Sequence, residues 1–154
     1  MELNKVTAYG AEPRATECTG LSELQKQVLE GTPYLHFLGL GVSREDDGTV
    51  CYQLCFREEH IGNPLLRTFH GGILASFGEV TAAAHLARQR GDDEVPLCST
   101  MTFDYLRPAF EGTLQAIPNI VRAGRRITTV SVQLRLEGKL VCIGRFLFLV
   151  GRNE

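Results

Sequence analysis

The architecture of this protein can be inferred from one stretch of its sequence, HGGILASFGEVTAAAHL at residues 70–86. Apolar side chains recur in it at helical spacing, among them Ile73, Phe77 and Val80, and the opposite side carries alanine and glycine. Almost no face is polar enough to be left in water. The stretch therefore predicts a long helix that the rest of the chain surrounds.

The first turn of this helix predicts a functional site. The first N–H groups of a helix have no partner within the helix and lie at the positive end of its dipole. Gly71 and Gly72 would therefore present donors to an oxyanion or a polarised carbonyl, with no side chain in the way. Two turns later comes Glu79, the one carboxylate in this apolar stretch. Burial of an unpaired carboxylate is unfavourable, so Glu79 is expected to have a partner or a chemical role.

The composition excludes several classes of partner. The chain has 154 residues and a net charge of -2, with basic and acidic residues interspersed, so neither nucleic acid nor a membrane surface is expected as a partner. No window approaches a membrane span and no signal peptide is recognisable, which predicts a cytoplasmic protein that acts on a small molecule. The cysteines show no metal-ligand spacing and are expected to be free thiols: Cys18, Cys51, Cys55, Cys98 and Cys142.

Alternation with a period of two predicts strands on both sides of the helix. Before it, a short helix at 22–31 is followed by a turn that opens at Thr32-Pro33, a strand that starts at Leu40, a turn at 46–48 and a strand at 50–56. A polar loop at 58–69 leads into the long helix, and four extended runs follow at 97–106, 113–122, 129–136 and 140–150. In the first run, alternation places Ser99 on the face of Phe103 and Cys98 on the other face; in the third, Val130, Val132, Leu134 and Leu136 share one apolar face. Pro118 is expected at an edge or a bulge, because proline cannot donate to a ladder.

These elements predict an α+β fold. Consecutive strands tend to pair with each other, so the simplest arrangement is one curved antiparallel sheet wrapped around one long central helix. Residues 1–20 show no period and are expected to form a flexible N-terminal arm, which leaves 21–154 as a single domain. A single sheet around a single helix leaves open edges, and dimerisation would cover them.

The combination of motifs resembles the hotdog-fold acyl-CoA thioesterases of the phenylacetic-acid (PaaI-like) type over about residues 33–150. The matching features are an Asn before the HGG at 70–72, an acid eight residues after the first glycine, a YLRP strand end at 105–108 and a GRR turn at 124–126. The resemblance implies a hydrolase that releases a free acid, aromatic or medium-chain, and coenzyme A. Coenzyme A is then part of the substrate, and no cofactor or metal is expected.

The resemblance also implies roles for individual residues. The amide of Gly71 would polarise the thioester carbonyl, Glu79 would act as base or nucleophile, Asn63 would hold the substrate or a water, and His70 would orient the loop or the carbonyl. The family's commoner acid is Asp, and Asn63 lies seven residues before His70, one more than in the usual pattern. The acid usually acts across a subunit interface, so a homodimer or a dimer of dimers (a homotetramer) is expected.

Further substrate contacts follow from the same resemblance. Some members carry a hydroxyl where this chain has Cys98, with Ser99 beside it. The alternative for Cys98 is a small buried thiol that only fills space. Arginines at 107, 125 and 126, with Gly124 in the turn, are candidates for the pantetheine and phosphate arms of coenzyme A, because guanidinium groups suit phosphate. The alternative for these arginines is a solvated position in a turn.

Other interpretations of the main residues remain open from the sequence. His70 could simply cap the helix, and Glu79 could form a structural ion pair with an arginine. An acyl-thioester hydratase or dehydratase would share the fold, but those enzymes pair the helix acid with a histidine in a different loop motif. A non-catalytic acyl-CoA binding protein is the second alternative. Neither an HExxH motif nor a GxSxG nucleophile elbow occurs in the chain.

Overall fold

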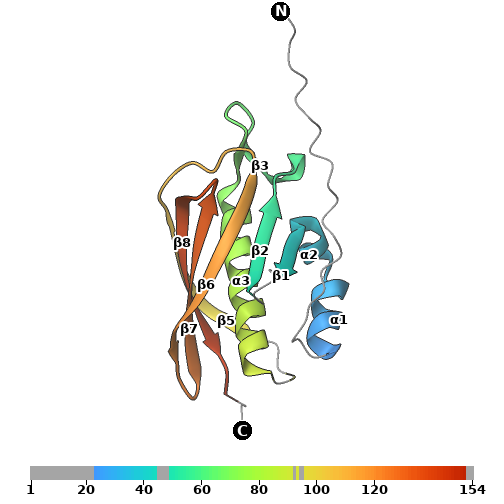
Figure 1. The fold of residues 1–154 in the computed structure, drawn as a ribbon, viewed down its shortest axis with the longest axis vertical. Coiled ribbons are helices and arrows are strands. Elements are labelled where there is room, and N and C mark those ends of the chain that lie inside the picture. Colours follow the sequence, from blue (N-terminus) through green and yellow to red (C-terminus); the bar gives the residue numbers. More distant parts are fainter. Residues whose placement is uncertain (1–22, 45–48, 92, 94–95, 152–154) are drawn as a thin grey trace, which may run out of the picture.

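The computed structural model describes residues 23–44, 49–91, 93 and 96–151. The predicted arm at 1–20 and the predicted turn at 46–48 lie outside these residues. Figure 1 shows the order of the elements along the chain. They are α1 (Glu23–Gly31), α2 (Pro33–Leu38), β1 (Leu40–Arg44), β2 (Val50–Cys55), the 3-10 turn η1 (Glu58–His60), β3 (Ile61–Asn63), β4 (Thr68–Phe69), α3 (Gly71–Arg90), β5 (Leu97–Tyr105), β6 (Thr113–Ala123), β7 (Ile127–Leu136) and β8 (Lys139–Leu149).

Helix α3 is the predicted central helix. It starts after His70, which has extended backbone angles, and it ends at Gly91, whose φ of 64° is a left-handed conformation that suits glycine. Its buried residues occur on nearly every side: Ile73, Leu74, Ala75, Phe77, Gly78, Thr81, Ala82, Ala84, Leu86 and Ala87. The prediction of a helix wrapped by the rest of the chain is confirmed.

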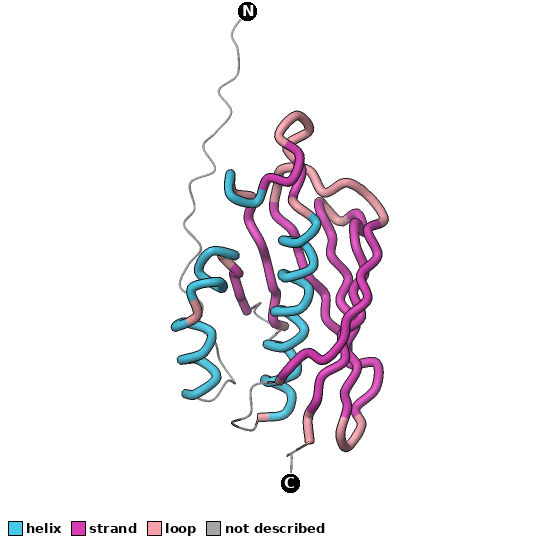
Figure 2. The backbone as a smooth tube through the Cα atoms, turned by 180° about the vertical axis from the view of Figure 1, so that it is seen from behind, coloured by secondary structure: helices cyan, strands magenta, loops and turns pink. Residues whose placement is uncertain are grey.

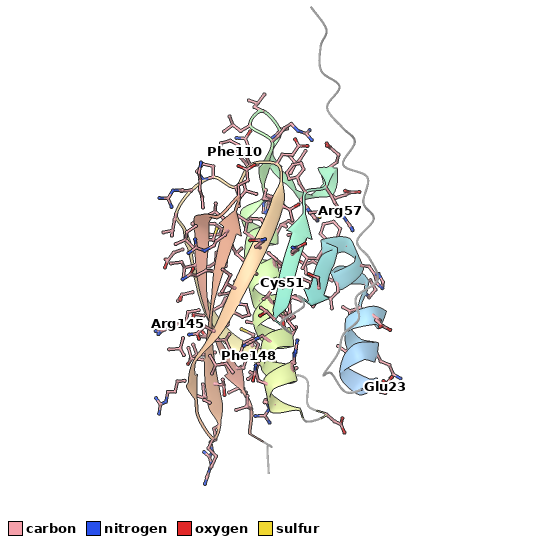
Figure 3. The ribbon with its side chains drawn as sticks, in the orientation of Figure 1. Glu23, Cys51, Arg57, Phe110, Arg145 and Phe148 are labelled. Atoms are coloured by element: carbon pink, nitrogen blue, oxygen red, sulfur yellow. The ribbon has the colours of Figure 1, made fainter. Side chains whose placement is uncertain are left out.

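The main sheet supplies most of that wrapping. It has six strands in the order β1-β2-β6-β7-β8-β5, and every neighbouring pair is antiparallel. Helix α3 packs against β5, β6, β7 and β8, and Figures 1 and 2 show the sheet curving around it. In Figure 3, Phe148 lies between sheet and helix, fully buried, whereas Arg145 lies on the outer face. The predicted α+β fold is therefore confirmed.

The strand order differs from the expected pairing of sequence neighbours. Strands β6, β7 and β8 form a meander as predicted, but β5 lies beyond β8 at one edge, and β6 pairs with β2. This arrangement brings Phe103 of β5 against Gly78 of α3, where an added Cβ would lie 3.0 Å from the ring. Pro118 follows Ala116, the last residue of β6 that is paired with β2, so its missing N–H faces an open side as expected.

Two segments predicted without regular structure are ordered elements. The polar loop at 58–69 contains η1 and the hairpin of β3 and β4, and His60 at the end of η1 is buried and stacks on Phe69 of β4. These strands of three and two residues are too short for periodicity to reveal. Helix α2 replaces a turn: Pro33 suits its first turn, and Gly39 ends it with a φ of 70°. Among the described helices, none has the length and apolar character that crossing a bilayer requires.

Candidate active site

The first turn of α3 has one unused backbone donor. The Gly72 N–H donates to Nδ1 of His70 at 2.9 Å, and the N–H groups of Ile73 and Leu74 both donate to the His70 carbonyl oxygen. For the Gly71 N–H, no acceptor is found in the described part of the chain. The expected pair of donors at Gly71 and Gly72 is therefore reduced to Gly71, which is the group that the sequence predicted as the oxyanion donor.

The surroundings of the Gly71 N–H strengthen it as a donor. It belongs to the same peptide group as the His70 carbonyl, which accepts two hydrogen bonds, and such bonds polarise the whole peptide. The dipole of the 20-residue helix adds positive potential at the same point. Since Nδ1 of His70 accepts a hydrogen bond, that nitrogen carries no hydrogen, and the ring N–H is at Nε2. His70 is thus the helix cap, and its exposed ring keeps one N–H for a ligand.

The hairpin of β3 and β4 lies directly against this turn. The His70 N–H donates to the His60 carbonyl at 2.7 Å, and a Cβ at Gly62 would lie only 2.5 Å from the His70 Cα. The pairing shifts register between Ile61 and Asn63, so Gly62 is an extra residue on β3. The bulge lies before Asn63, so it does not account for the additional residue between Asn63 and His70.

Asn63 is engaged in its own turn. Its side-chain oxygen accepts hydrogen bonds from the N–H groups of Leu65 and Leu66, at 3.0 and 3.1 Å. Only the amide NH₂ of this exposed side chain is left for a ligand. The predicted contact of Asn63 with substrate or water is therefore limited to donation.

Glu79 lies on the half-buried stripe of α3 together with Ser76, Val80 and Ala83. No cation or hydrogen-bond donor pairs with its carboxylate among the residues that the structure describes. The alternative of a structural ion pair has no support there. Burial, and then the negative charge of Glu79, raise the pKa of the nearby Cys98 thiol.

Strand β5 turns Cys98 toward the helix through a bulge. The pairing with β8 shifts register between Cys98 and Thr100, so strict alternation is broken at Ser99. Cys98 and Phe103 consequently both pack against the core, whereas the exposed Ser99 donates its hydroxyl to the Leu147 carbonyl. The sequence placed Ser99, not Cys98, on the side of Phe103, and that prediction is wrong.

Gly71 and Glu79 cannot act on one thioester within a single chain. They are eight residues apart in α3, which corresponds to about 12 Å along the helix axis. A carbonyl held at Gly71 and a water activated by Glu79 would have to approach within about 3–3.5 Å. The glutamate side chain is too short to close that gap.

Comparison with known proteins identifies the family. A family model described as the thioesterase superfamily matches residues 66–143, about half of the chain. The chain belongs to the thioesterase superfamily. Membership supports thioester hydrolysis in general, and it confirms the resemblance found in the sequence. No match is found among curated proteins.

Solved structures agree with this thioesterase assignment. A thioesterase-superfamily protein is 29% identical with a TM-score of 0.72, covering 83% of this chain and 96% of its own. A Bacillus halodurans protein crystallised with CoA is 22% identical with a TM-score of 0.72, and the coverage is 88% and 99%. A phenylacetic acid degradation-related protein from Ralstonia eutropha is 22% identical with a TM-score of 0.68, and the coverage is 81% and 98%. The two at 22% support the hotdog fold alone.

The candidate arginines of this thioesterase lie at opposite ends of the sheet. Arg107 donates to the Leu140 carbonyl at 2.7 Å and lines a hollow of about 290 Å³ that also includes Gly71. Arg125 and Arg126 are exposed in the turn between β6 and β7, where a Cβ at Gly124 would lie 2.5 Å from the Ile127 carbonyl oxygen. Strand β7 separates that turn from the Arg107 end by roughly 30 Å.

A larger hollow of about 900 Å³ shares Arg107 and Pro108 with the first one. Its other lining residues are Phe110, Glu111, Leu136, Glu137, Lys139, Leu140 and Val141. The carboxylate of Glu111 is already paired with Arg67 at 2.8 Å. Arg107, Lys139 and apolar groups therefore continue outward from Gly71, together with the carboxylate of Glu137.

One residue of the site was recognised in the sequence only as part of a motif. Tyr105, the last residue of β5, donates its hydroxyl to the Gly71 carbonyl oxygen at 2.9 Å. No local pattern links two residues 34 positions apart, and only the placement of β5 beside β8 brings them together.

Proposed function

We propose that this thioesterase hydrolyses an acyl-CoA to the free acid and coenzyme A. The observation that carries the proposal is the unused Gly71 N–H at the positive end of α3, in a turn from which a hollow leads to Arg107. The thioester oxygen would accept from this N–H as negative charge develops on it. The coenzyme A in the Bacillus halodurans structure supports coenzyme A as the thiol part of the substrate.

Glu79 supplies the chemistry at the carbonyl carbon. As a base it takes a proton from water while the water oxygen bonds to the carbon; the C–S bond then breaks, and coenzyme A leaves as a thiolate that takes up a proton. As a nucleophile its carboxylate bonds to the carbon first, and the C–S bond breaks to release coenzyme A as a thiolate that takes up a proton. Water then hydrolyses the resulting anhydride by attack on the Glu79 carboxyl carbon. A single turnover in ¹⁸O water separates the routes, because only the second transfers a labelled oxygen to Glu79.

The active site is composite, with Gly71 from one subunit and Glu79 from its partner. The separation of about 12 Å within one helix requires a second source for the acid. Strand β5 ends the sheet and exposes Leu97 and Met101, so pairing of two β5 edges about a two-fold axis would continue the sheet and set the two α3 helices antiparallel. The same axis would carry Arg125 and Arg126 of the partner toward the Gly71 end.

A tetramer and a cytoplasmic location stay predictions.

A panel of acyl-CoA esters with detection of released thiol tests the activity. We expect Glu79→Gln to keep the fold and to lower kcat by roughly 10²- to 10⁴-fold, the scale for loss of a general base. A variant as active as the wild type would disprove the role of Glu79. Binding without turnover of any ester in the wild type would favour the acyl-CoA binding alternative.

Mixing two inactive variants tests the composite site. In a dimer of Glu79→Gln with Gly71→Pro, one site has both defects and the other has none. Random exchange of equal amounts makes about half of the dimers mixed, so about one quarter of wild-type activity should return. No recovery, despite exchange proven with labelled subunits, would refute the cross-subunit arrangement.

A further inference from the structure

The side chain of Tyr105 packs against the backbone of Gly71. Its hydroxyl donates to the Gly71 carbonyl at 2.9 Å, and a Cβ added at Gly71 would lie 3.2 Å from the ring. The absence of a side chain at Gly71 is what allows this approach. Burial raises the pKa of Tyr105, so the hydroxyl keeps its proton and acts as a donor at neutral pH.

The peptide between Gly71 and Gly72 is held on both sides. Tyr105 holds its carbonyl, and Nδ1 of His70 holds its N–H at 2.9 Å. The preceding peptide is held through the His70 carbonyl, which accepts from Ile73 and Leu74. The Gly71 N–H therefore lies in a fixed peptide plane, and the next plane along the chain is fixed as well, although two successive glycines have the widest backbone freedom of any residue pair.

The sheet supplies a rigid base for the hydroxyl. The ring of Tyr105 packs against Phe103 with centroids 5.0 Å apart. Directly after it, the N–H groups of Leu106 and Arg107 both donate to the Val141 carbonyl, which ties this strand end to β8. The position of the hydroxyl is thus set by strand pairing and not by the loop before α3.

We propose that Tyr105 is a positioning residue, whose hydroxyl fixes the Gly71–Gly72 peptide and so aims the Gly71 N–H at the thioester oxygen. The inference rests on the proposed function for the identity of the ligand, but the hydrogen bond itself is independent of it. Small misplacements of catalytic groups lower rates by up to about 10²-fold, so the hydroxyl matters even though it does not touch the substrate.

Tyr105→Phe removes the hydroxyl and keeps the ring. We expect kcat on an acyl-CoA to fall by roughly ten- to hundredfold with KM and the thermal midpoint unchanged, because the loss is in orientation and not in binding. The matched control is Tyr34→Phe, which removes the hydroxyl that donates to Ser76 Oγ on the same helix at 2.6 Å. The control should keep the wild-type kcat.

A second readout needs no turnover. Gly71-Gly72 is the one Gly-Gly pair among the 16 glycines of the chain. Protein labelled with ¹³C-carbonyl, ¹⁵N-glycine therefore gives one amide signal coupled to a labelled carbonyl, and it reports on the peptide that Tyr105 holds. Its carbonyl shift should move upfield in Tyr105→Phe and stay unchanged in Tyr34→Phe.

The two readouts separate the possible failures. An unchanged carbonyl shift in Tyr105→Phe, or a moved shift with wild-type kcat, would overturn the positioning role. If the wild type hydrolyses no acyl-CoA while the shift moves as expected, the proposed function fails and the hydrogen bond stands. A fall in kcat accompanied by an equal loss in Tyr34→Phe would assign the effect to helix packing and also overturn the role.

Discussion

Gly71→Pro removes the candidate oxyanion donor with little other change to the backbone. Proline has no N–H and is well tolerated in the first turn of a helix, where Gly71 lies. The preceding residue must be extended, and His70 already has φ -66° and ψ 137°. The substitution therefore removes the N–H and preserves the backbone conformation on both sides, but it adds a ring whose Cβ would lie 3.2 Å from the Tyr105 ring.

The size of the effect follows from what remains at the site. The Gly72, Ile73 and Leu74 amides are already bonded to His70, so no other N–H of the first turn can take over. Loss of one oxyanion donor lowers kcat by about 10²- to 10³-fold, or about 2.7–4 kcal/mol of transition-state stabilisation. We expect a loss of that size in kcat, with KM changed little.

Gly71→Ala is the matched control. Its Cβ would meet the same Tyr105 ring at 3.2 Å, but it keeps the N–H. The ratio of the two kcat values, measured as thiol release with thermal midpoints recorded alongside, isolates the donor. If both variants lose the same activity, crowding against Tyr105 explains the result and the oxyanion role of Gly71 is refuted.

Three further predictions test other parts of the molecule. Arg107→Ala should raise KM roughly tenfold on a CoA ester and leave KM on a pantetheine ester unchanged; equal changes would make the arginine structural. Glu137→Asn should stabilise the β7–β8 turn by about 0.5–1 kcal/mol in urea denaturation, because Glu137 and Gly138 have φ values of 49° and 77°; a lower midpoint contradicts this. Cys142 is buried and its pKa is raised to about 11, so its thiolate is scarce below that pH. At pH 8 it should resist alkylation until the protein unfolds, while the exposed Cys55 reacts, as peptide mapping would show.

Local patterns in the sequence were sufficient for the individual elements. The apolar character of residues 73–87 on every side predicted a wrapped helix, and α3 is buried in that way. Alternation predicted the inner face of β7, whose residues Val130, Val132 and Leu134 are fully buried. These features depend only on the geometry of one helix or one strand, which repeats along the chain and leaves a period in the sequence.

The HGG motif and its spacing to Glu79 could also be recognised in the sequence, because both lie in one helix. Eight helical residues correspond to about 12 Å, which is too far for Gly71 and Glu79 of one chain to act on the same thioester, so the spacing also favours a second subunit. The sequence could not predict which N–H group of the first turn has no hydrogen-bond acceptor among the described residues. That depends on the rotamer of His70, whose Nδ1 takes the Gly72 N–H.

The tertiary structure alone decided the strand order and the contacts that follow from it. Alternation assigns a residue to a face of a sheet but does not name the neighbouring strand, so β5 could not be placed beside β8. The bulge at Ser99 reverses the faces of β5 and brings Cys98 toward Glu79. The bond from Tyr105 to Gly71 likewise joins residues whose proximity arises only when sheet and helix pack. Local sequence thus fixes the conformation of each segment, whereas contacts between distant segments depend on the free energy of burying them together.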